Sequence, residues 1–281
     1  MEAYVVDAFT KTPYGGNAAG VVLLADGYPP ERDMLALAAK LGFSETVFLL
    51  PLSDDAFRLR YFTPAAEVDL CGHATVAAFH TLLQFGKLRA GQRYTAQTLA
   101  GDIAVDIDSD GCVWLDMAPP RELGVLSVED TAALYAMFGL VPGDAGALAP
   151  AIVDTGLPDI MMPVASRALL AALKPDWSAI SDLSRTLQVT GVHVFTPGDA
   201  AVTAYVRNFA PLYGIDEEAA TGTSNGALSY YLYRRGHICA GETNVFLQGE
   251  AMGRPSEIRS RLTEAGGKVN IRIGGYAAIR P

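Results

Sequence analysis

The stretch that decides the fold is "EVDLCGHATVAAF", residues 67–79, in which a cysteine, a glycine and a histidine precede an apolar run. Helical periodicity continues beyond this run and predicts a helix over residues 73–85, closed by Gly86. A second stretch, "TGTSNGAL" at residues 221–228, has the same design of a glycine followed by a helix. Here the periodicity predicts a helix over residues 223–235.

The two helices belong to a longer internal repeat. Matching residues lie 147 positions apart in the first part of each half, and 150 apart after a three-residue insertion, so that Gly72 matches Gly222 and Gly86 matches Gly236. Each half contains a strand ending in Arg-x-Phe-x-Pro, an acidic loop, a glycine and a helix. The pairs at 147 positions are Val6-Asp7 with Val153-Asp154, Val47-Phe48 with Val194-Phe195, and Arg60, Phe62 and Pro64 with Arg207, Phe209 and Pro211.

Strand-like runs rich in Val, Ile and aromatic residues alternate with helical segments, which predicts an α/β (α+β) fold of two similar domains. The further helices are predicted over residues 31–41, 128–138, 166–173 and 178–187. Two prolines follow a strand in "DMAPPRELG" (116–124), so we expect an N-terminal domain over residues 1–118 and a C-terminal domain over 119–281. The last strand, about 268–280, could return to the first domain. A cleft between two such domains is the usual place for a small-molecule site.

The composition excludes several classes of protein. A formal charge of −10 without a basic patch argues against nucleic-acid binding. The N-terminus lacks a basic n-region, and apolar runs such as residues 18–25 are too short to cross a bilayer. Three dispersed cysteines exclude a disulfide framework and a CxxC zinc site, and no nucleotide-binding motif occurs. We therefore expect a cytoplasmic, soluble protein with no metal, no cofactor and no membrane partner.

The two glycine turns are candidate anion sites. Gly72 and Gly222 each stand at a predicted helix start, where unpaired N–H groups and the helix dipole favour negative charge. A substrate carboxylate, or an enolate formed during a reaction, could bind there. The alternative is structural: Thr223 or Ser224 caps its helix, and Gly72 only turns the chain.

Two residues beside the first glycine could exchange protons. His73 has a side-chain pKa that is ordinarily near neutrality, although it could equally cap the helix or be hydrogen-bonded in the interface. Cys71 stands where a helix start lowers a thiol pKa, but cysteine also packs as a small apolar residue. The repeat places Thr221 opposite Cys71, and a threonine is no general base at neutral pH. A symmetric two-thiol mechanism is therefore excluded.

Glu45 is the third candidate, because it is an acid within the apolar segment "GFSETVFLL". Burial there would raise its pKa and suit it to proton transfer, whereas an exposed position would make it an ordinary strand-entrance residue. Its counterpart in the repeat is Val192, so the fold does not require an acid there. An acidic run precedes the second glycine turn, and one of its members could point into the cleft. The run is Asp216, Glu217 and Glu218.

Seven motifs, in order from Val6 to Gly275, resemble the PhzF-like family of phenazine-biosynthesis isomerases. They are "VDAFTKTPYGGNAAGVV", "SETVF", "YFTPAAEVDLCGHATVA", "DTGLPDI", "RNFAPLYGIDEEAATGTSNGAL", "LQGEAMGRPS" and "IRIGG". The family is similar in fold to diaminopimelate epimerase, in which each of two alike domains wraps a sheet around a central helix. The resemblance identifies the central helices as those near 73–85 and 223–235.

The resemblance implies cofactor-free isomerisation of a small carboxylic acid by proton transfer, with Glu45 as the general acid and base. It further implies that the residues binding the substrate are Asn17, Gly72, His73, Glu218, Gly222 and Thr223. A homodimer is also expected from this resemblance.

Two departures from the family pattern leave alternatives open. Glu218-Ala219 stands where Asp-Pro is expected, so the carboxylate reaches one methylene further and the substrate could differ. Cys71 occupies the position of the first catalytic thiol of diaminopimelate epimerase, which suggests an epimerase that uses Cys71 as one base and Glu45 or His73 as the other. A third alternative is a protein of the same fold that binds a small anion without turnover.

Overall fold

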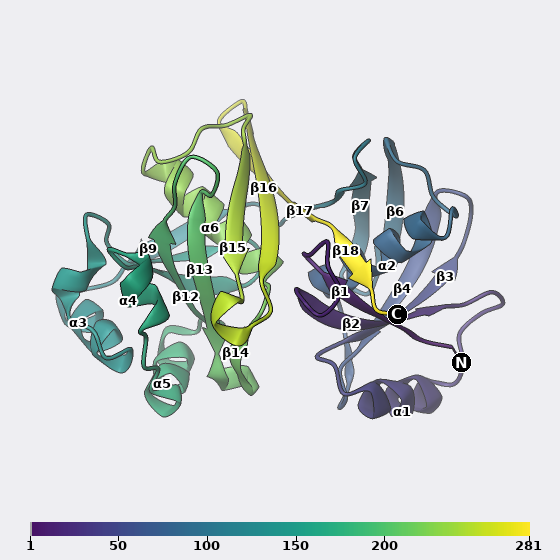
Figure 1. Cartoon of the computed structure of the whole chain (residues 1–281), viewed down its shortest axis with the longest axis horizontal. Coiled ribbons are helices and arrows are strands. Elements are labelled where there is room, and N and C mark those ends of the chain that lie inside the picture. The colour runs from purple at the N-terminus through teal and green to yellow at the C-terminus, as the bar shows by residue number, and fades with distance from the viewer. Residues whose placement is uncertain (1) are drawn as a thin grey trace. The chain divides into compact units, whose positions relative to one another are not determined.

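The computed structural model describes residues 2–281 and divides into two compact units. The N-terminal unit extends to Asp116 and also includes Gly274–Pro281, whereas the C-terminal unit is Met117–Ile273. Each unit contains a mixed sheet and one long buried helix (Figure 1). This is the α/β architecture of two similar parts, each with a sheet and a central helix, that the sequence predicts.

The sheet of the N-terminal unit alternates antiparallel and parallel neighbours. β1 pairs antiparallel with β2, β2 parallel with β3, β3 antiparallel with β4, β4 parallel with β6, and β6 antiparallel with β7. β8 pairs with β7, and the short β5 pairs with β4. The strands are β1 (Tyr4–Ala8), β2 (Asn17–Leu23), β3 (Thr46–Pro51), β4 (Ala56–Phe62), β5 (Glu67–Val68), β6 (Gln92–Thr98), β7 (Gly101–Ile107) and β8 (Val113–Asp116).

The sheet of the C-terminal unit has the same succession of pairings. β10 pairs antiparallel with β11, β11 parallel with β12, β12 antiparallel with β13, β13 parallel with β15, and β15 antiparallel with β16. β9 pairs with β10, and β14 pairs with β13. The strands are β9 (Arg121–Val125), β10 (Ala151–Asp154), β11 (Pro158–Pro163), β12 (Gly191–Pro197), β13 (Ala204–Ala210), β14 (Ile215–Glu218), β15 (Thr243–Gln248) and β16 (Ser256–Ala265).

The repeat extends from topology to one ion pair. In the N-terminal unit the Arg60 guanidinium donates two hydrogen bonds of 2.6 Å to Glu67. In the C-terminal unit Arg207 donates to Glu217 at 2.9 and 2.7 Å. Both pairs join the strand that ends in Arg-x-Phe-x-Pro to the short strand before the buried helix. A bidentate Arg–carboxylate pair fixes orientation as well as distance. The same ion pair therefore positions the short strand that leads into the buried helix of each unit.

The buried helices are α2 (Gly72–Gln84) and α6 (Gly222–Arg234), each 13 residues long. Every residue from His73 to Leu82 is buried, and most of them are apolar, as expected for a helix that is enclosed on all sides. It packs against β1, β2, β3, β8 and β18, and α6 packs against β10, β11 and β16. Both helices begin one residue earlier than the periodicity predicts, at the glycine itself.

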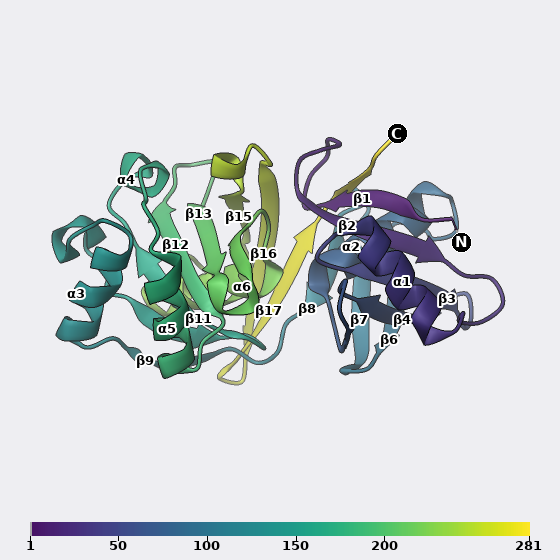
Figure 2. The same cartoon turned by 90° about the horizontal axis from the view of Figure 1, so that it is seen from below.

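The remaining helices lie outside the sheets, as Figure 2 shows for α1 in one unit and for α3, α4 and α5 in the other. Met34 and Ala38 of α1 pack with Val22, Phe48 and Phe62. In the C-terminal unit a larger outer core surrounds Phe138 and Phe209. The helices are α1 (Glu31–Leu41), α3 (Val128–Met137), α4 (Arg167–Ala171) and α5 (Trp177–Leu187), which confirms all four predicted segments.

The C-terminal segment is two strands and not the single strand predicted over about 268–280. β17 (Lys268–Gly275) leads from the C-terminal unit to the N-terminal unit, where β18 (Ala277–Ile279) pairs antiparallel with β1. The break falls at Tyr276, whose carbonyl accepts a hydrogen bond of 2.7 Å from the backbone of Phe9. No helix among residues 2–281 is long and apolar enough to span a membrane.

Candidate active site

Glu45 is placed by the end of α1 and the start of β3. Gly42 takes the left-handed conformation (φ 69°) that ends α1, and a short loop then leads to Glu45. The Glu45 carbonyl accepts a hydrogen bond of 3.1 Å from the backbone N–H of Gly20 in β2. The glutamate backbone is therefore held by the parallel β2–β3 pairing, while its side chain retains 20% exposure.

His73 lies in the first turn of α2, and its ring is 7% exposed. Its Nε2 lies 3.3 Å from Glu45 Oε2 and 3.5 Å from Ser44 Oγ. Its Nδ1 lies 3.5 Å from the amide nitrogen of Asn17, the first residue of β2. His73 thus contacts a carboxyl group on one side and an amide on the other, and does not cap its helix.

Cys71 completes this cluster. It is the N-cap residue of α2 and is 8% exposed. Its Sγ lies 3.4 Å from His73 Nδ1 and 3.8 Å from Nε2. One donor atom each from Glu45, Cys71 and His73 lies within 4.8 Å of the other two. Three groups able to carry protons therefore meet at the start of the buried helix.

One oxygen of this cluster is available for chemistry. Oε2 of Glu45 is buried, and within residues 2–281 no hydrogen bond of acceptable geometry reaches it. Its 3.3 Å approach to His73 Nε2 is close enough for electrostatic attraction without the alignment of a hydrogen bond. A buried oxygen left in this state costs stability. Such a cost is typical of a group reserved for a substrate or for a proton in transfer.

In the C-terminal unit the helix start is built from amide and hydroxyl groups. Thr221 is the N-cap residue of α6, and its Oγ1 donates a hydrogen bond of 2.6 Å to Glu218 Oε2. Gln248 donates through Nε2 to Thr221 Oγ1 at 3.1 Å and to the Glu218 carbonyl at 2.8 Å. Of the acidic run, Glu217 is the partner of Arg207 and Glu218 lies beside the helix start. Sequence reasoning missed Gln248, although it lies in the quoted motif "LQGEAMGRPS".

The capping alternative for Thr223 and Ser224 is wrong. Ser224 is buried, and its Oγ donates a hydrogen bond of 2.5 Å to Asp159 Oδ2 on β11. The Thr223 carbonyl accepts a hydrogen bond of 2.9 Å from Thr155 Oγ1. Neither N-cap side chain, in α2 or in α6, makes a capping hydrogen bond to its helix. The first-turn N–H groups of these two helices therefore receive no hydrogen bond from an N-cap side chain.

Two buried titratable residues, Asp159 and His193, lie near the start of α6 in the C-terminal unit. Burial raises the pKa of Asp159 to about 6, against the lowering effect of hydrogen bonds from Ser224 and Gly191. Burial also lowers the pKa of His193 to about 4, and its Nδ1 lies 3.0 Å from Asn208 Oδ1. Sequence reasoning missed both residues, although Asp159 lies in the quoted motif "DTGLPDI".

We expect Asp159→Asn to change how stability depends on pH. The folded-state pKa lies above the ordinary 3.8, so the stabilising contribution is present below about pH 4 and is lost as pH rises to about 6. The loss amounts to roughly 3 kcal/mol. In urea unfolding between pH 4 and 7, the free energy of unfolding of the variant should therefore increase relative to that of the wild type as pH rises.

The variant must be compared with the wild type because two buried histidines affect the pH dependence of stability in the opposite sense. Burial lowers the pKa values of His193 and His80 to about 4, so their contribution to the free energy of unfolding increases as pH rises over this range. Asp182→Asn, at an exposed position paired with Arg185, is the control and should follow the wild type. A constant difference between Asp159→Asn and wild type across this range would contradict the assignment.

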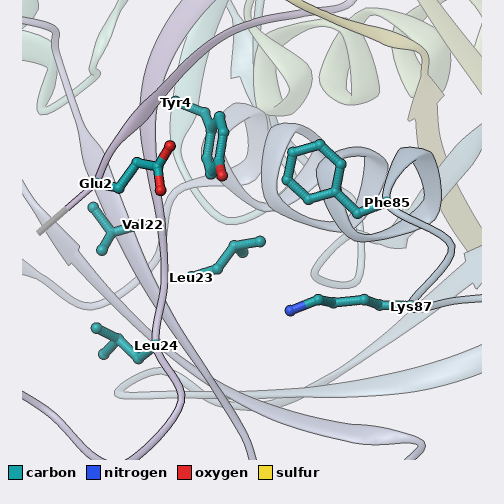
Figure 3. Close-up of a pocket in the computed structure, with 7 residues that line it drawn as sticks. All are labelled: Glu2, Tyr4, Val22, Leu23, Leu24, Phe85 and Lys87. Atoms are coloured by element: carbon teal, nitrogen blue, oxygen red, sulfur yellow. The ribbon is translucent and has the colours of Figure 1, made fainter.

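A separate hollow of about 560 Å³ opens on the N-terminal unit (Figure 3). Its walls combine charged and apolar side chains, and Tyr4 and Phe85 pack edge to face at 5.1 Å between ring centres. Its lining residues are Glu2, Tyr4, Val22, Leu23, Leu24, Phe85 and Lys87. None of these belongs to the cluster at Glu45, and the hollow is therefore not the candidate active site.

The model of one protein family, described as phenazine biosynthesis-like protein (PhzC-PhzF), matches residues 6–280. The chain belongs to the PhzF family. It is 38% identical to an uncharacterised isomerase from Deinococcus radiodurans, over 98% of this chain and 91% of that protein. It is 30% identical to the trans-2,3-dihydro-3-hydroxyanthranilate isomerase of Pseudomonas aeruginosa, over 99% of this chain and 97% of that enzyme. This PhzF-family chain is an isomerase.

Solved structures agree with this family assignment. A PhzF-family protein from Bacillus anthracis matches with a TM-score of 0.90 and 27% identity, covering 100% of this chain and 98% of that one. A probable proline racemase from Agrobacterium radiobacter matches with a TM-score of 0.64 and 15% identity, covering 99% and 90%. The second likeness concerns the fold alone.

Proposed function

We propose that this PhzF-family isomerase moves a proton within a small carboxylic acid without a cofactor, and that Glu45 is the general acid and base. The observation that carries the proposal is the buried Oε2 of Glu45, which lies beside His73 and has no aligned donor among residues 2–281. A carboxylate in that state can accept a proton from carbon and return it to another carbon of the same substrate.

The proton balance of this reaction is closed. Glu45 removes a proton from one carbon, and the electron pair of the broken C–H bond moves into the conjugated system toward the substrate carboxyl group. The double bond shifts as the protonated Glu45 delivers the proton to another carbon, which restores the carboxylate. No oxidant, reductant or leaving group takes part.

The remaining residues bind the substrate in this proposal. His73 and Asn17 orient its polar groups beside Glu45, and the backbone N–H groups at Gly72 stabilise negative charge as it develops. Gly222, Thr223 and Glu218 are proposed as further substrate contacts. Because Glu218 is one methylene longer than the aspartate of the family pattern, we infer a substrate related to, but different from, the dihydro-hydroxyanthranilate of the Pseudomonas aeruginosa enzyme.

The test of the proposed function is deuterium incorporation from D2O into a panel of cyclohexadiene-type, hydroxy- and amino-carboxylates, read by mass spectrometry. Exchange catalysed by the wild type supports a proton-transfer isomerase and identifies its substrate class. Tight binding of a panel member without exchange would instead support an anion-binding protein that lacks turnover. The cytoplasmic location and the homodimer are separate inferences; light scattering of the purified protein tests the latter.

The substitution Cys71→Ala distinguishes the proposal from the epimerase alternative. That alternative is worth testing because Cys71 Sγ lies 3.4 Å from His73 Nδ1. If Glu45 alone carries the proton, the variant should retain exchange activity within about tenfold of wild type. An epimerase that uses the thiol as one base should lose roughly 10²-fold or more. Initial rates of deuterium exchange under saturating substrate measure the difference.

A further inference from the structure

We propose that Glu45, Cys71 and His73 form a binding site for one Zn²⁺ ion, and that zinc at this site blocks the isomerase reversibly. The blocking effect rests on the proposed function, because it requires Glu45 to be the acid and base. The binding itself rests only on the donor atoms.

Two of the three separations between the donor atoms are close to those of a tetrahedral zinc site. With zinc–sulfur bonds of about 2.3 Å and zinc–nitrogen or zinc–oxygen bonds of about 2.0–2.2 Å, tetrahedral angles separate the ligand atoms by roughly 3.3–3.6 Å. Here Glu45 Oε2 lies 3.3 Å from His73 Nε2, which in turn lies 3.8 Å from Cys71 Sγ. All three donor atoms lie within 4.8 Å of one another, so the thiol and the carboxylate must approach by at most about 1 Å to bind the ion.

The donors are also chemically suited to zinc. A thiolate, an imidazole and a carboxylate are the three ligand types that proteins offer to Zn²⁺, and three protein ligands leave a fourth position for water. With Nε2 on the metal, His73 Nδ1 carries the ring proton, and Asn17, whose amide nitrogen lies 3.5 Å from Nδ1, accepts this N–H once its amide is flipped to present the oxygen. A polar group at the second ring nitrogen fixes the orientation of a metal-binding histidine.

Two features hold the donors in place before any metal arrives. Cys71 and His73 flank Gly72 at the rigid start of the buried helix, and the backbone of Glu45 is bonded to Gly20. The donor oxygen of Glu45 is buried and lacks an aligned hydrogen bond within residues 2–281. A cation would coordinate that oxygen, which could then no longer accept the substrate proton.

The charges predict moderate and pH-dependent affinity. The thiolate and the carboxylate together neutralise the charge of Zn²⁺, whereas the positive end of the α2 dipole opposes a cation. Because the thiol must lose its proton and the imidazole must be neutral, binding should weaken as pH falls. Reversible inhibition, removed by a chelator, is therefore expected rather than a permanent structural metal.

This cluster is the single group of three such donors found among residues 2–281. The sequence predicted no metal site because zinc motifs are recognised by short, regular spacings of their ligands. Glu45 is remote in sequence from the Cys-x-His pair, and only the fold brings it there.

The experiment titrates metal-free protein with Zn²⁺ against a chromophoric chelator, and separately with Co²⁺ to observe the absorption of a thiolate–cobalt bond. We expect one equivalent of Zn²⁺ to bind and Co²⁺ to give the thiolate band. Cys71→Ser should abolish the band and weaken zinc binding by roughly 10²-fold or more, and Glu45→Gln should also weaken it. Cys239→Ser, at an exposed cysteine, is the matched control and should bind like the wild type.

Zinc binding that survives both Cys71→Ser and Glu45→Gln, or that disappears in Cys239→Ser, would overturn the site. Thermal unfolding of each variant verifies that it is folded; if Cys71→Ser does not fold, Glu45→Gln and the wild-type cobalt spectrum decide. If one equivalent of bound zinc left the rate of deuterium exchange unchanged, the proposed inhibition would be overturned. Absence of exchange by the metal-free wild type would count against the proposed function, while the cobalt band still reports on the site.

Discussion

Glu45→Gln is expected to lower the rate of substrate deuterium exchange by roughly 10²–10⁴-fold, because glutamine keeps the size of the side chain but cannot accept or return a proton. The loss should fall mainly on kcat, since the amide can still occupy the same space beside His73. Stability should change little, because Oε2 of Glu45 makes no aligned hydrogen bond within residues 2–281 that the substitution would break. Rates in D2O with the substrate identified from the carboxylate panel provide the measurement.

Two further variants sharpen this test. Glu45→Asp keeps a carboxylate one methylene further from its target and should recover part of the activity. Glu250→Gln changes a half-exposed glutamate paired with Arg167 in the other unit and should behave like the wild type. Full turnover by Glu45→Gln would refute the proposed role of the carboxylate and would shift the proton transfer to Cys71 or His73.

Gly16→Ala is expected to destabilise the protein by roughly 3 kcal/mol or more, from left-handed strain together with overpacking. Gly16 has φ +59°, and an added Cβ would lie 2.1 Å from the carbonyl oxygen of Ala8. That oxygen belongs to β1, the strand paired with β2, so the backbone itself must move. Because Asn17 is the next residue, its amide should also lose its position beside His73, and exchange activity should fall with stability.

Gly42→Ala is the matched control for this prediction. Gly42 has φ +69°, nearly the same backbone conformation, but nothing lies within 4 Å of an added Cβ. Gly42→Ala should cost only the conformational strain, about 1–2 kcal/mol. Urea unfolding of both variants measures the two losses. Equal losses would show that the contact with Ala8 is unimportant and that the strain at φ > 0 accounts for both.

The secondary structure was largely predictable because its signals are local. Periodicity indicated all six helices, and the repeat correctly paired the two buried ones. Strands were harder to predict: β9 overlaps the stretch taken as a domain boundary, and the C-terminal strand is broken at Tyr276. In both places the strand pairing depends on strands that are distant in the sequence, and this pairing cannot be predicted from a single run of residues.

The acidic run before α6 illustrates the same limit within a site. Composition alone could not tell Asp216, Glu217 and Glu218 apart. The structure assigns Glu217 to a two-hydrogen-bond pair with Arg207 and leaves Glu218 beside Thr221. The repeat held a partial signal, since Glu217 lies 150 positions after Glu67, the acid of the equivalent pair.

The sequence by itself determined the family, the duplicated architecture and the residues able to carry chemistry, because motifs, periodicity and glycine turns are properties of short segments. Only the tertiary structure decided which of those residues meet. Parallel pairing of β2 with β3 and the packing of α2 on both strands bring Glu45, Cys71 and His73 within 4.8 Å. The same kind of packing buries Asp159 beneath Ser224, where the loss of solvent raises the pKa of its carboxyl to about 6.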